Sequence, residues 1–111
     1  GVSVDILIVL NQDQMGVGDA LLGKRVLKTY LQKSVMLHGE VAIAFYNSGV
    51  KLMAEDSPVL GELQMLHDRG VDLLPCGTCV DHYGCPPAIG EVSTMADIVE
   101  AMNQASKVIT L

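Results

Sequence analysis

The chain has 111 residues, of which half are hydrophobic and 4% are aromatic, so aliphatic side chains must fill the core of a single domain. Its 13 acidic and 7 basic residues give a net charge of −6, which argues against direct binding to nucleic acids or anionic membranes. It shows no apolar run long enough to span a bilayer and no signal-peptide pattern. Three cysteines, an odd number, favour a reducing cytoplasm over a secreted disulfide framework.

Strand and helix signals alternate from the start of the chain. Residues 3–10 form an apolar, β-branched run that predicts a strand, and a polar loop follows at 11–18. Asp19 is expected to cap a helix that stops at His38-Gly39. The predicted apolar side of this helix consists of Leu22, Val26, Leu27, Tyr30 and Leu31.

A second strand is predicted at 41–46, where the turn Asn47-Ser48-Gly49 ends it. Asp56 or Ser57, followed by Pro58, predicts the start of a second helix, which Gly70 closes. Its apolar side is predicted to be Val59, Leu60, Leu63 and Leu66. Residues 71–75 then predict a third strand.

The last third of the chain repeats this alternation. A short helix is predicted at 78–83, and Thr94 begins another in the manner of a capping box. The apolar side of that helix is predicted to be Met95, Ile98, Val99 and Met102. Residues 107–111 predict the final strand. This order indicates an α/β fold, a three-layer α/β/α domain over residues 1–111 with a mainly parallel sheet. The loops 11–18, 47–53 and 76–85 should then meet at one edge of the sheet.

The strongest functional signal is the sequence Cys76-Gly77-Thr78-Cys79 at the end of the third predicted strand. A thiol at the carboxyl end of a parallel strand faces the ligand-binding side of an open sheet, and a following helix lowers the pKa of that thiol. Such a pair can hold sulfane sulfur as a persulfide or close a disulfide. Packing alone and a metal site are the alternatives.

The metal alternative rests on Cys76, Cys79, His82 and Cys85, which recur every three residues. In a helix each such step leaves successive side chains about 60° apart around the axis and about 4.5 Å apart along it. Four ligands so arranged do not converge on one ion, and we therefore expect neither a metal nor another cofactor.

The turn Asn47-Ser48-Gly49 is the second candidate feature, because its amide, hydroxyl and backbone N–H groups suit an anionic sulfur. With Gly77 and Thr78 it forms the predicted substrate pocket beside the cysteines. Gly16-Val17-Gly18 lacks the third glycine of a dinucleotide-binding motif, since position 21 is Leu, so a nucleotide site is not expected.

Several segments together resemble the DsrE/DsrF-like domain of YedF-type selenium-metabolism proteins. They include Phe45-Tyr46-Asn47-Ser48-Gly49-Val50-Lys51-Leu52, Ser57-Pro58-Val59-Leu60, Cys76-Gly77-Thr78-Cys79 and Gly90-Glu91-Val92. This resemblance implies an α/β/α fold with a five-stranded parallel sheet. It also implies sulfur relay, in which the cysteine that ends the third strand accepts sulfur as a persulfide and a glycine follows eight residues later. Cys76 and Gly84 match that spacing.

The resemblance assigns Cys76 as the sulfur acceptor and Cys79 as its resolving or auxiliary thiol. It implies a sulfurtransferase or persulfide carrier that handles sulfur or selenium, whose partner is a sulfur-carrier (TusA-like) domain or a sulfurtransferase. Related relay domains also imply a homo-oligomer. A different class of function stays open from the residues themselves: a non-catalytic interaction module whose CxxC pair acts as a redox switch.

Overall fold

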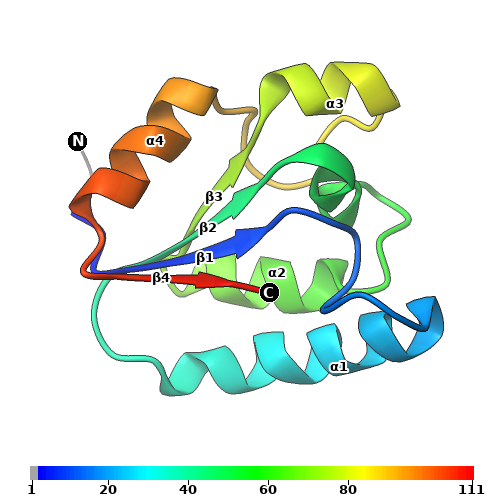
Figure 1. Ribbon diagram of the computed structural model, residues 1–111, viewed down its shortest axis with the longest axis horizontal. Helices are drawn as coiled ribbons and strands as arrows, with labels where there is room; N and C mark the ends of the chain where they lie inside the picture. Colours follow the sequence, from blue (N-terminus) through cyan, green and yellow to red (C-terminus); the bar gives the residue numbers. More distant parts are fainter. Residues whose placement is uncertain (1–2) are drawn as a thin grey trace.

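The computed structural model describes residues 3–111 and has alternating strands and helices (Figure 1). The strands are β1 (Ile6–Leu10), β2 (Val41–Phe45), β3 (Asp72–Pro75) and β4 (Lys107–Thr110). The α-helices are α1 (Ala20–Lys33), α2 (Leu60–Asp68), α3 (Gly77–Tyr83) and α4 (Met95–Gln104). Two 3₁₀ helices, η1 (Ser34–Met36) and η2 (Asn47–Met53), follow α1 and β2.

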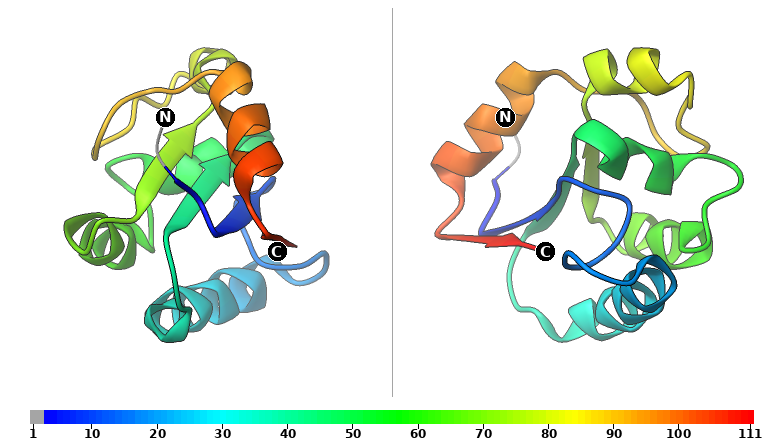
Figure 2. Two further views of the ribbon diagram at one scale, coloured as in Figure 1. Left: turned by 90° about the vertical axis from the view of Figure 1, so that its left-hand side faces the viewer. Right: turned by 45° about the vertical axis from the view of Figure 1, so that its right-hand side comes forward.

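The four strands form one parallel sheet in the order β3-β2-β1-β4. Alternation along β1 and β2 sorts the side chains between the two faces of the sheet. Larger residues such as Ile43 and Phe45 pack on the face covered by α1 and α2, whereas Ala42 and Ala44 lie on the other face. The small alanines leave room for α4, whose Ile98 and Ala101 are buried against that second face. The result is the predicted three-layer α/β/α arrangement (Figures 1 and 2).

The expectation of a fifth strand is wrong, because the described residues form a sheet of four. Beside β3, where another strand could lie, the chain makes only an isolated parallel bridge between Cys76 and Ser93. Pro86 and Pro87 lack backbone N–H groups and Gly90 has a φ of +65°, so the segment before Ser93 does not extend as a strand. Thr94 then caps α4 at once.

The helices were predicted in the right order but partly with the wrong bounds and orientation. α2 begins at Leu60 with Val59 as its N-cap residue, and not at Asp56 or Ser57 as predicted. Asp19 caps α1 as predicted, since its carboxylate accepts the Leu22 N–H at 2.8 Å. However, α1 ends at Lys33, and its buried residues are Gly23, Leu27 and Leu31, while Leu22 and Val26 are exposed. On α4, Met95 and Val99 are likewise exposed. The reason is geometric: each helix packs over a single face of the sheet and buries a stripe narrower than its full apolar surface.

The order of the strands places the cysteines away from the point where the topology reverses. Chain connections run outward from β1 to β3 and then return to β4, so the reversal lies between β1 and β4. Open α/β sheets commonly bind ligands at that point. Cys76 instead follows β3, the edge strand, and is separated from the reversal by β2 and β1. The chemistry of the site therefore depends on the contacts of the cysteines themselves and not on their place in the strand order.

Candidate functional site

Cys76 lies between β3 and α3 and is the N-cap residue of α3. Its backbone is still extended, with φ −62° and ψ 120°, while Gly77 begins the helix. Its N–H is donated to the carbonyl of Phe45 in β2, which fixes Cys76 to the sheet. The side chain is 4% exposed and packs on the same face as Ala44 and Leu74. The sulfur is therefore held at the end of a strand and largely shielded from solvent.

Polar groups in the first turn of α3 lower the pKa of the Cys76 thiol. Burial raises the pKa of the Cys76 thiol, but the N–H and S–H of Cys79 and the N–H and hydroxyl of Thr78 lower it, and the net pKa is lower than usual. The Gly77 N–H does not take part, because it is donated to the carbonyl of Ser93 at 3.0 Å. These contacts favour a thiolate at Cys76.

Cys79 lies one helical turn further on and has the opposite tendency. Burial raises its pKa, the backbone N–H of Asn47 lowers it, and the hydrogen bond to Cys76 and the negative charge there raise it, so that the net pKa is higher than usual. The Asn47 N–H donates to the Cys79 sulfur at 3.1 Å. The pair thus combines one thiol that favours ionisation with a neighbour that favours the neutral form.

The conformation of Asn47 brings its N–H to Cys79. Asn47 has a φ of +51°, the left-handed region that asparagine tolerates better than most residues. Its side-chain oxygen accepts the Ser48 N–H at 2.8 Å and the Tyr83 hydroxyl at 2.7 Å. Lys51 lies over the Tyr83 ring, with its Nζ 4.6 Å from the ring centre. This network joins the start of η2 to the last turn of α3.

Beside Cys79 the surface has a shallow hollow of about 330 Å³. It is lined by Asn47, Thr78, Cys79, His82 and Tyr83. A larger open groove of about 1070 Å³ begins on the other side of Tyr83 and includes Lys51 and Cys85. Cys79 is therefore the cysteine that borders the hollow. Cys76 is buried among the residues on the sheet face that α4 covers.

The structure brings together some of the predicted pocket residues and places others beneath them. Asn47 and Thr78 line the hollow, and both approach the cysteine pair through their backbone N–H groups. The Ser48 and Gly49 N–H groups are already donated, to the Asn47 side chain and to the Tyr46 carbonyl. With Gly77 bonded to Ser93, these three residues hold the surrounding backbone. Their roles toward a substrate remain predictions.

The loop 11–18 was expected beside the cysteines, but its contacts are with α1. Met15 donates its N–H to the Gly23 carbonyl, and Asp13 lies 3.6 Å from the Lys24 ammonium. The start of the loop nevertheless lies beside η2: the Leu10 carbonyl accepts the Tyr46 N–H, and a Cβ on Gly49 would lie 3.4 Å from the Gln12 nitrogen. The loop 11–18 therefore meets the loop 47–53 at its first residues, and the rest of it packs on α1.

Sequence reasoning missed Tyr83 and Lys51. Tyr83 is four residues after Cys79, so the two share one side of α3, and this spacing could have indicated their proximity. Lys51 could not have been found in this way, because η2 was read only as a break after the second strand. His82 is exposed, as expected, and its ring meets that of Tyr83 edge to face.

The four residues of the metal alternative lie on or directly after a helix. α3 spans Gly77–Tyr83, and within residues 3–111 no three His, Cys, Asp or Glu side chains are grouped so as to hold an ion. We predict that protein purified without chelators contains far less than one zinc or iron per chain by elemental analysis. About one metal per chain, lost together with thiol reactivity when a chelator is added, would contradict this expectation.

We predict that Cys76 ionises at a lower pH than an ordinary thiol. In a Cys79→Ser, Cys85→Ser background, the rate of Cys76 alkylation should reach half of its maximum below about pH 8.5, the usual thiol value. The physical reason is that groups of residues 78 and 79 lower the pKa of Cys76. The serine at position 79 of this variant keeps both an N–H and a hydroxyl there. A midpoint at or above about pH 8.5 would remove Cys76 as the nucleophile.

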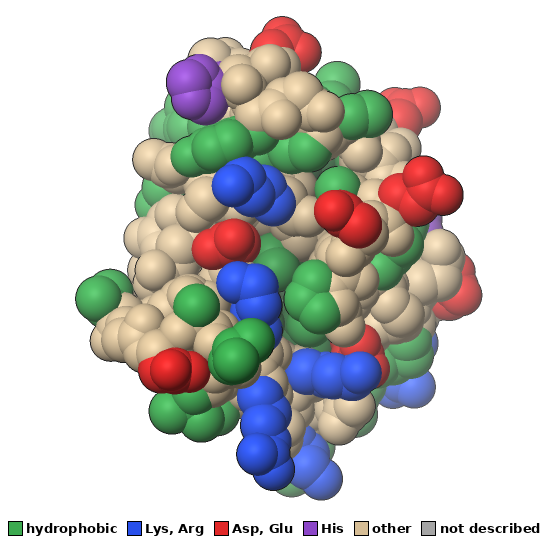
Figure 3. Space-filling model, turned by 90° about the vertical axis from the view of Figure 1, so that its right-hand side faces the viewer, with side chains coloured by type: hydrophobic (Ala, Val, Ile, Leu, Met, Phe, Trp, Pro, Cys, Tyr) green, Lys and Arg blue, Asp and Glu red, His purple; other side chains and the backbone are tan. Residues whose placement is uncertain are grey.

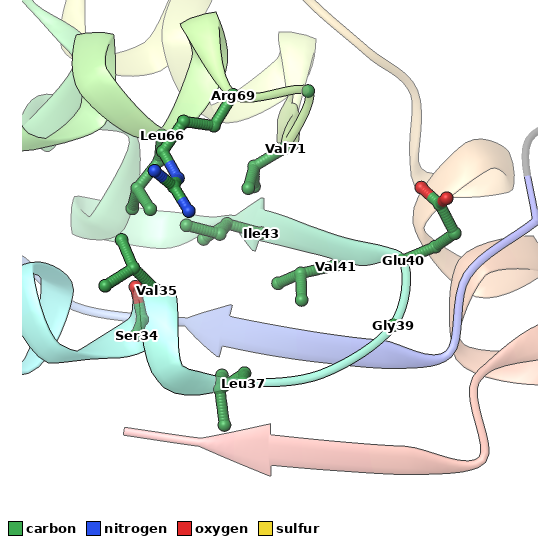
Figure 4. Close-up of a pocket in the computed structure, with 11 residues that line it drawn as sticks. Ser34, Val35, Leu37, Gly39, Glu40, Val41, Ile43, Leu66, Arg69 and Val71 are labelled. Carbon is green, nitrogen blue, oxygen red and sulfur yellow. The ribbon is translucent and has the colours of Figure 1, made fainter.

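A further hollow, of about 200 Å³, lies at the opposite end of the strands, between η1 and the turn after α2. Figure 4 shows the guanidinium of Arg69 directed toward Leu66 and Val35, while the carboxylate of Glu40 points away. Its lining includes no cysteine or histidine. The hydroxyl of Ser34, which also lines it, is donated to the Leu31 carbonyl at 2.7 Å and has no histidine beside it to act as a base. The cysteine pair therefore remains the candidate site.

The parallel α/β/α fold, with two neighbouring cysteines where β3 meets α3, defines a small α/β protein. The family model described as the DsrE/DsrF-like family matches residues 6–111, and the chain belongs to this family. The family is associated with sulfur relay and sulfurtransferase-like functions. A comparison with curated protein sequences found no significant match.

Two solved structures show the same fold. The ychN protein from E. coli is 21% identical, with a TM-score of 0.71, and the alignment covers 97% of this chain and 99% of that one. MTH1491 from Methanobacterium thermoautotrophicum, described as a protein of unknown function, is 16% identical, with a TM-score of 0.67 and coverage of 94% and 98%. Among the helices of residues 3–111, none has the length and apolar character needed to cross a membrane.

Proposed function

We propose that this domain accepts sulfane sulfur on Cys76 as a persulfide and passes it to a partner. The observation that carries the proposal is a buried thiol at the junction of a parallel strand and a helix, where groups of residues 78 and 79 lower its pKa. The Cys76 thiolate attacks the outer sulfur of a donor persulfide and forms a new sulfur–sulfur bond. The bond between the two sulfurs of the donor breaks, and the donor leaves as a thiolate, which can take a proton from water. No oxidant is needed, because the sulfur moves without a net change in oxidation state.

Membership of the DsrE/DsrF-like family supports this reaction, and the resemblance to YedF-type domains extends the proposal to selenium. The partner would be a TusA-like sulfur-carrier domain or a sulfurtransferase, and the site would work in a reducing cytoplasm that keeps both thiols free. Because Cys76 is 4% exposed, the partner's thiol must approach through the hollow beside Thr78 and Cys79.

The test begins with the Cys79→Ser chain, which holds the acceptor alone. After anaerobic incubation with a low-molecular-weight persulfide, peptide mapping should find one added sulfur atom on Cys76. Subsequent incubation with a TusA-like carrier should move that atom to the carrier. A matched reaction with a selenium donor shows whether selenium is accepted as well. If Cys76 stays unmodified in this variant, while the pair in the wild-type chain only forms a disulfide under oxidants, the domain is instead an interaction module with a redox switch.

We also propose that the chain forms homo-oligomers. α1 carries four basic residues and no acidic one, in a chain whose net charge is −6. Val17, Leu21, Leu22 and Val26 are exposed on or just before this helix. Figure 3, which faces the side where α1 begins, shows Lys and Arg side chains with hydrophobic side chains between them. A basic, apolar surface on an acidic molecule is suited to contact with an acidic region of another copy.

The prediction is that light scattering at micromolar concentration gives a mass of at least two chains of 11.8 kDa. Leu21→Glu, at a side chain that is 82% exposed, should shift the mass toward the monomer because it buries a charge in the contact. A monomer at all concentrations, with or without moderate salt, would refute the assembly.

A further inference from the structure

We propose that the cysteine pair has a second activity: when no acceptor takes the sulfur, Cys79 ejects it from Cys76 as hydrosulfide. The inference rests on the proposed function, because the Cys76 persulfide is its starting point. It goes beyond relay, since the bound sulfur leaves in reduced form and the protein is left as a disulfide.

The first support is the contact between the two sulfurs. Cys76 is the N-cap residue of α3 and Cys79 is the third residue of the helix, and each thiol is close enough to shift the pKa of the other. Side chains three residues apart on a helix have Cβ atoms about 5–6 Å apart, and a disulfide requires about 3.5–4.5 Å. Cys76 is outside the helix, with ψ 120°, so its backbone is not held by the helical hydrogen bonds, and the proposal requires it to rotate enough to close this difference.

The reaction balances without another oxidant. The Cys79 thiolate attacks the Cys76 sulfur of the persulfide, a Cys76–Cys79 bond forms, and the bond between Cys76 and the terminal sulfur breaks. The electron pair of that bond leaves with the terminal sulfur as HS⁻, and the proton of Cys79 passes to water. The two thiols have then lost two electrons, which the sulfane sulfur has gained. A dithiol reductant returns the pair to its starting state for another turnover.

The second support is the surroundings of Cys79, which assist this attack and limit its rate. The Asn47 N–H, 3.1 Å from the Cys79 sulfur, stabilises the thiolate as it forms, and the Tyr83 hydroxyl holds the Asn47 side chain at 2.7 Å. Burial opposes that ionisation, which gives an acceptor time to collect the sulfur. Cys79 also borders the hollow, so hydrosulfide has a route to solvent.

The experiment compares the wild-type chain, Cys79→Ser, Cys79→Ala and Cys85→Ser in anaerobic single-turnover reactions with a low-molecular-weight persulfide and no added thiol. Wild type and Cys85→Ser should release about one hydrosulfide per chain, lose two hydrogen atoms in intact mass, and resist alkylation at positions 76 and 79. Both Cys79 variants should keep one added sulfur atom on Cys76 and release at least tenfold less hydrosulfide.

The results separate the two proposals. If the Cys79 variants take up no sulfur, the proposed function fails. If they keep the sulfur and the wild type also keeps it, without disulfide or hydrosulfide, relay stands and ejection is overturned. Release that disappears in Cys85→Ser also overturns ejection by Cys79, because Cys85 would then be the attacking thiol.

The role of Asn47 is tested through Tyr83→Phe, which removes the hydroxyl and keeps the ring beneath Lys51. Hydrosulfide release, measured on chains that already carry one sulfur atom on Cys76, should slow about three- to tenfold. In a Cys76→Ser, Cys85→Ser background, the alkylation midpoint of Cys79 should move to higher pH. Tyr30→Phe, on α1, is the matched control and should change neither quantity. Unchanged release and an unchanged midpoint in Tyr83→Phe would overturn this positioning role.

Discussion

Replacing Cys76 with serine is expected to abolish uptake of sulfane sulfur, with the rate falling by about a thousandfold or more. A serine hydroxyl does not ionise near neutral pH, so the donors from residues 78 and 79 would surround a group that cannot attack sulfur. The measurement is the rate at which one sulfur atom appears on the chain after mixing with a low-molecular-weight persulfide.

The matched control is Cys85→Ser, because Cys85 lies beyond Tyr83 in the open groove and shares no hydrogen bond with the pair. It should take up sulfur at the wild-type rate. Both variants should also keep the wild-type melting temperature within a few degrees, which shows that uptake was lost through chemistry. Rapid uptake by Cys76→Ser, mapped to Cys79, would transfer the acceptor role to that residue.

Replacing Gly49 with alanine is expected to reduce the free energy of unfolding by at least about 2 kcal/mol and to disturb the site. A Cβ at this position would overlap the carbonyl oxygen of Leu10, which also accepts the Tyr46 N–H. Relief of the overlap must move the start of η2, and Asn47 with it, away from Cys79. Urea denaturation measures the loss of stability, and alkylation of Cys79 reports the change at the sulfur.

Gly61→Ala provides the comparison, since a Cβ at this exposed position in α2 would meet no atom within 4 Å. Alanine in a helix should raise the free energy of unfolding by about 0.5–1 kcal/mol and leave the cysteines unchanged. Equal effects of the two substitutions would show that the close approach of Gly49 to β1 has no structural importance.

The pattern of apolar residues was enough to predict the strands and the order of the elements. A short, continuous apolar run such as 41–46, ended by a turn, is typical of a strand buried on both faces, and β2 lies there. Asp19 and Thr94 act as the helix caps that were expected. The single bridge at Ser93 could not be foreseen, because it depends on how the chain turns after Gly84 rather than on any local preference. For the same reason the family resemblance predicted one strand too many.

The candidate site was predicted at Cys76 and Asn47 but not in its detailed roles. Sequence spacing places 76 and 79 on adjacent turns, and the end of a neighbouring strand brings residue 47 nearby. The fold decides which backbone N–H groups remain free. The Gly77 N–H is donated to the Ser93 carbonyl, and the Gly49 N–H is donated to the Tyr46 carbonyl. The left-handed conformation of Asn47 likewise depends on Tyr83, which is 36 residues away.

The bridge between Cys76 and Ser93 bears on how long the buried sulfur stays protected from oxidation. The Ser93 N–H donates to the Pro75 carbonyl at 2.7 Å, and the Ser93 carbonyl accepts the Gly77 N–H at 3.0 Å. These two hydrogen bonds hold the chain on both sides of Cys76. Breaking them does not require the other strand pairs to separate, and amide hydrogen exchange at Gly77 and Ser93 should therefore be faster than in β1 and β2. The frequency of this local opening, rather than global unfolding, would set the rate at which peroxide converts the thiolate to sulfenic acid, the first product of its oxidation.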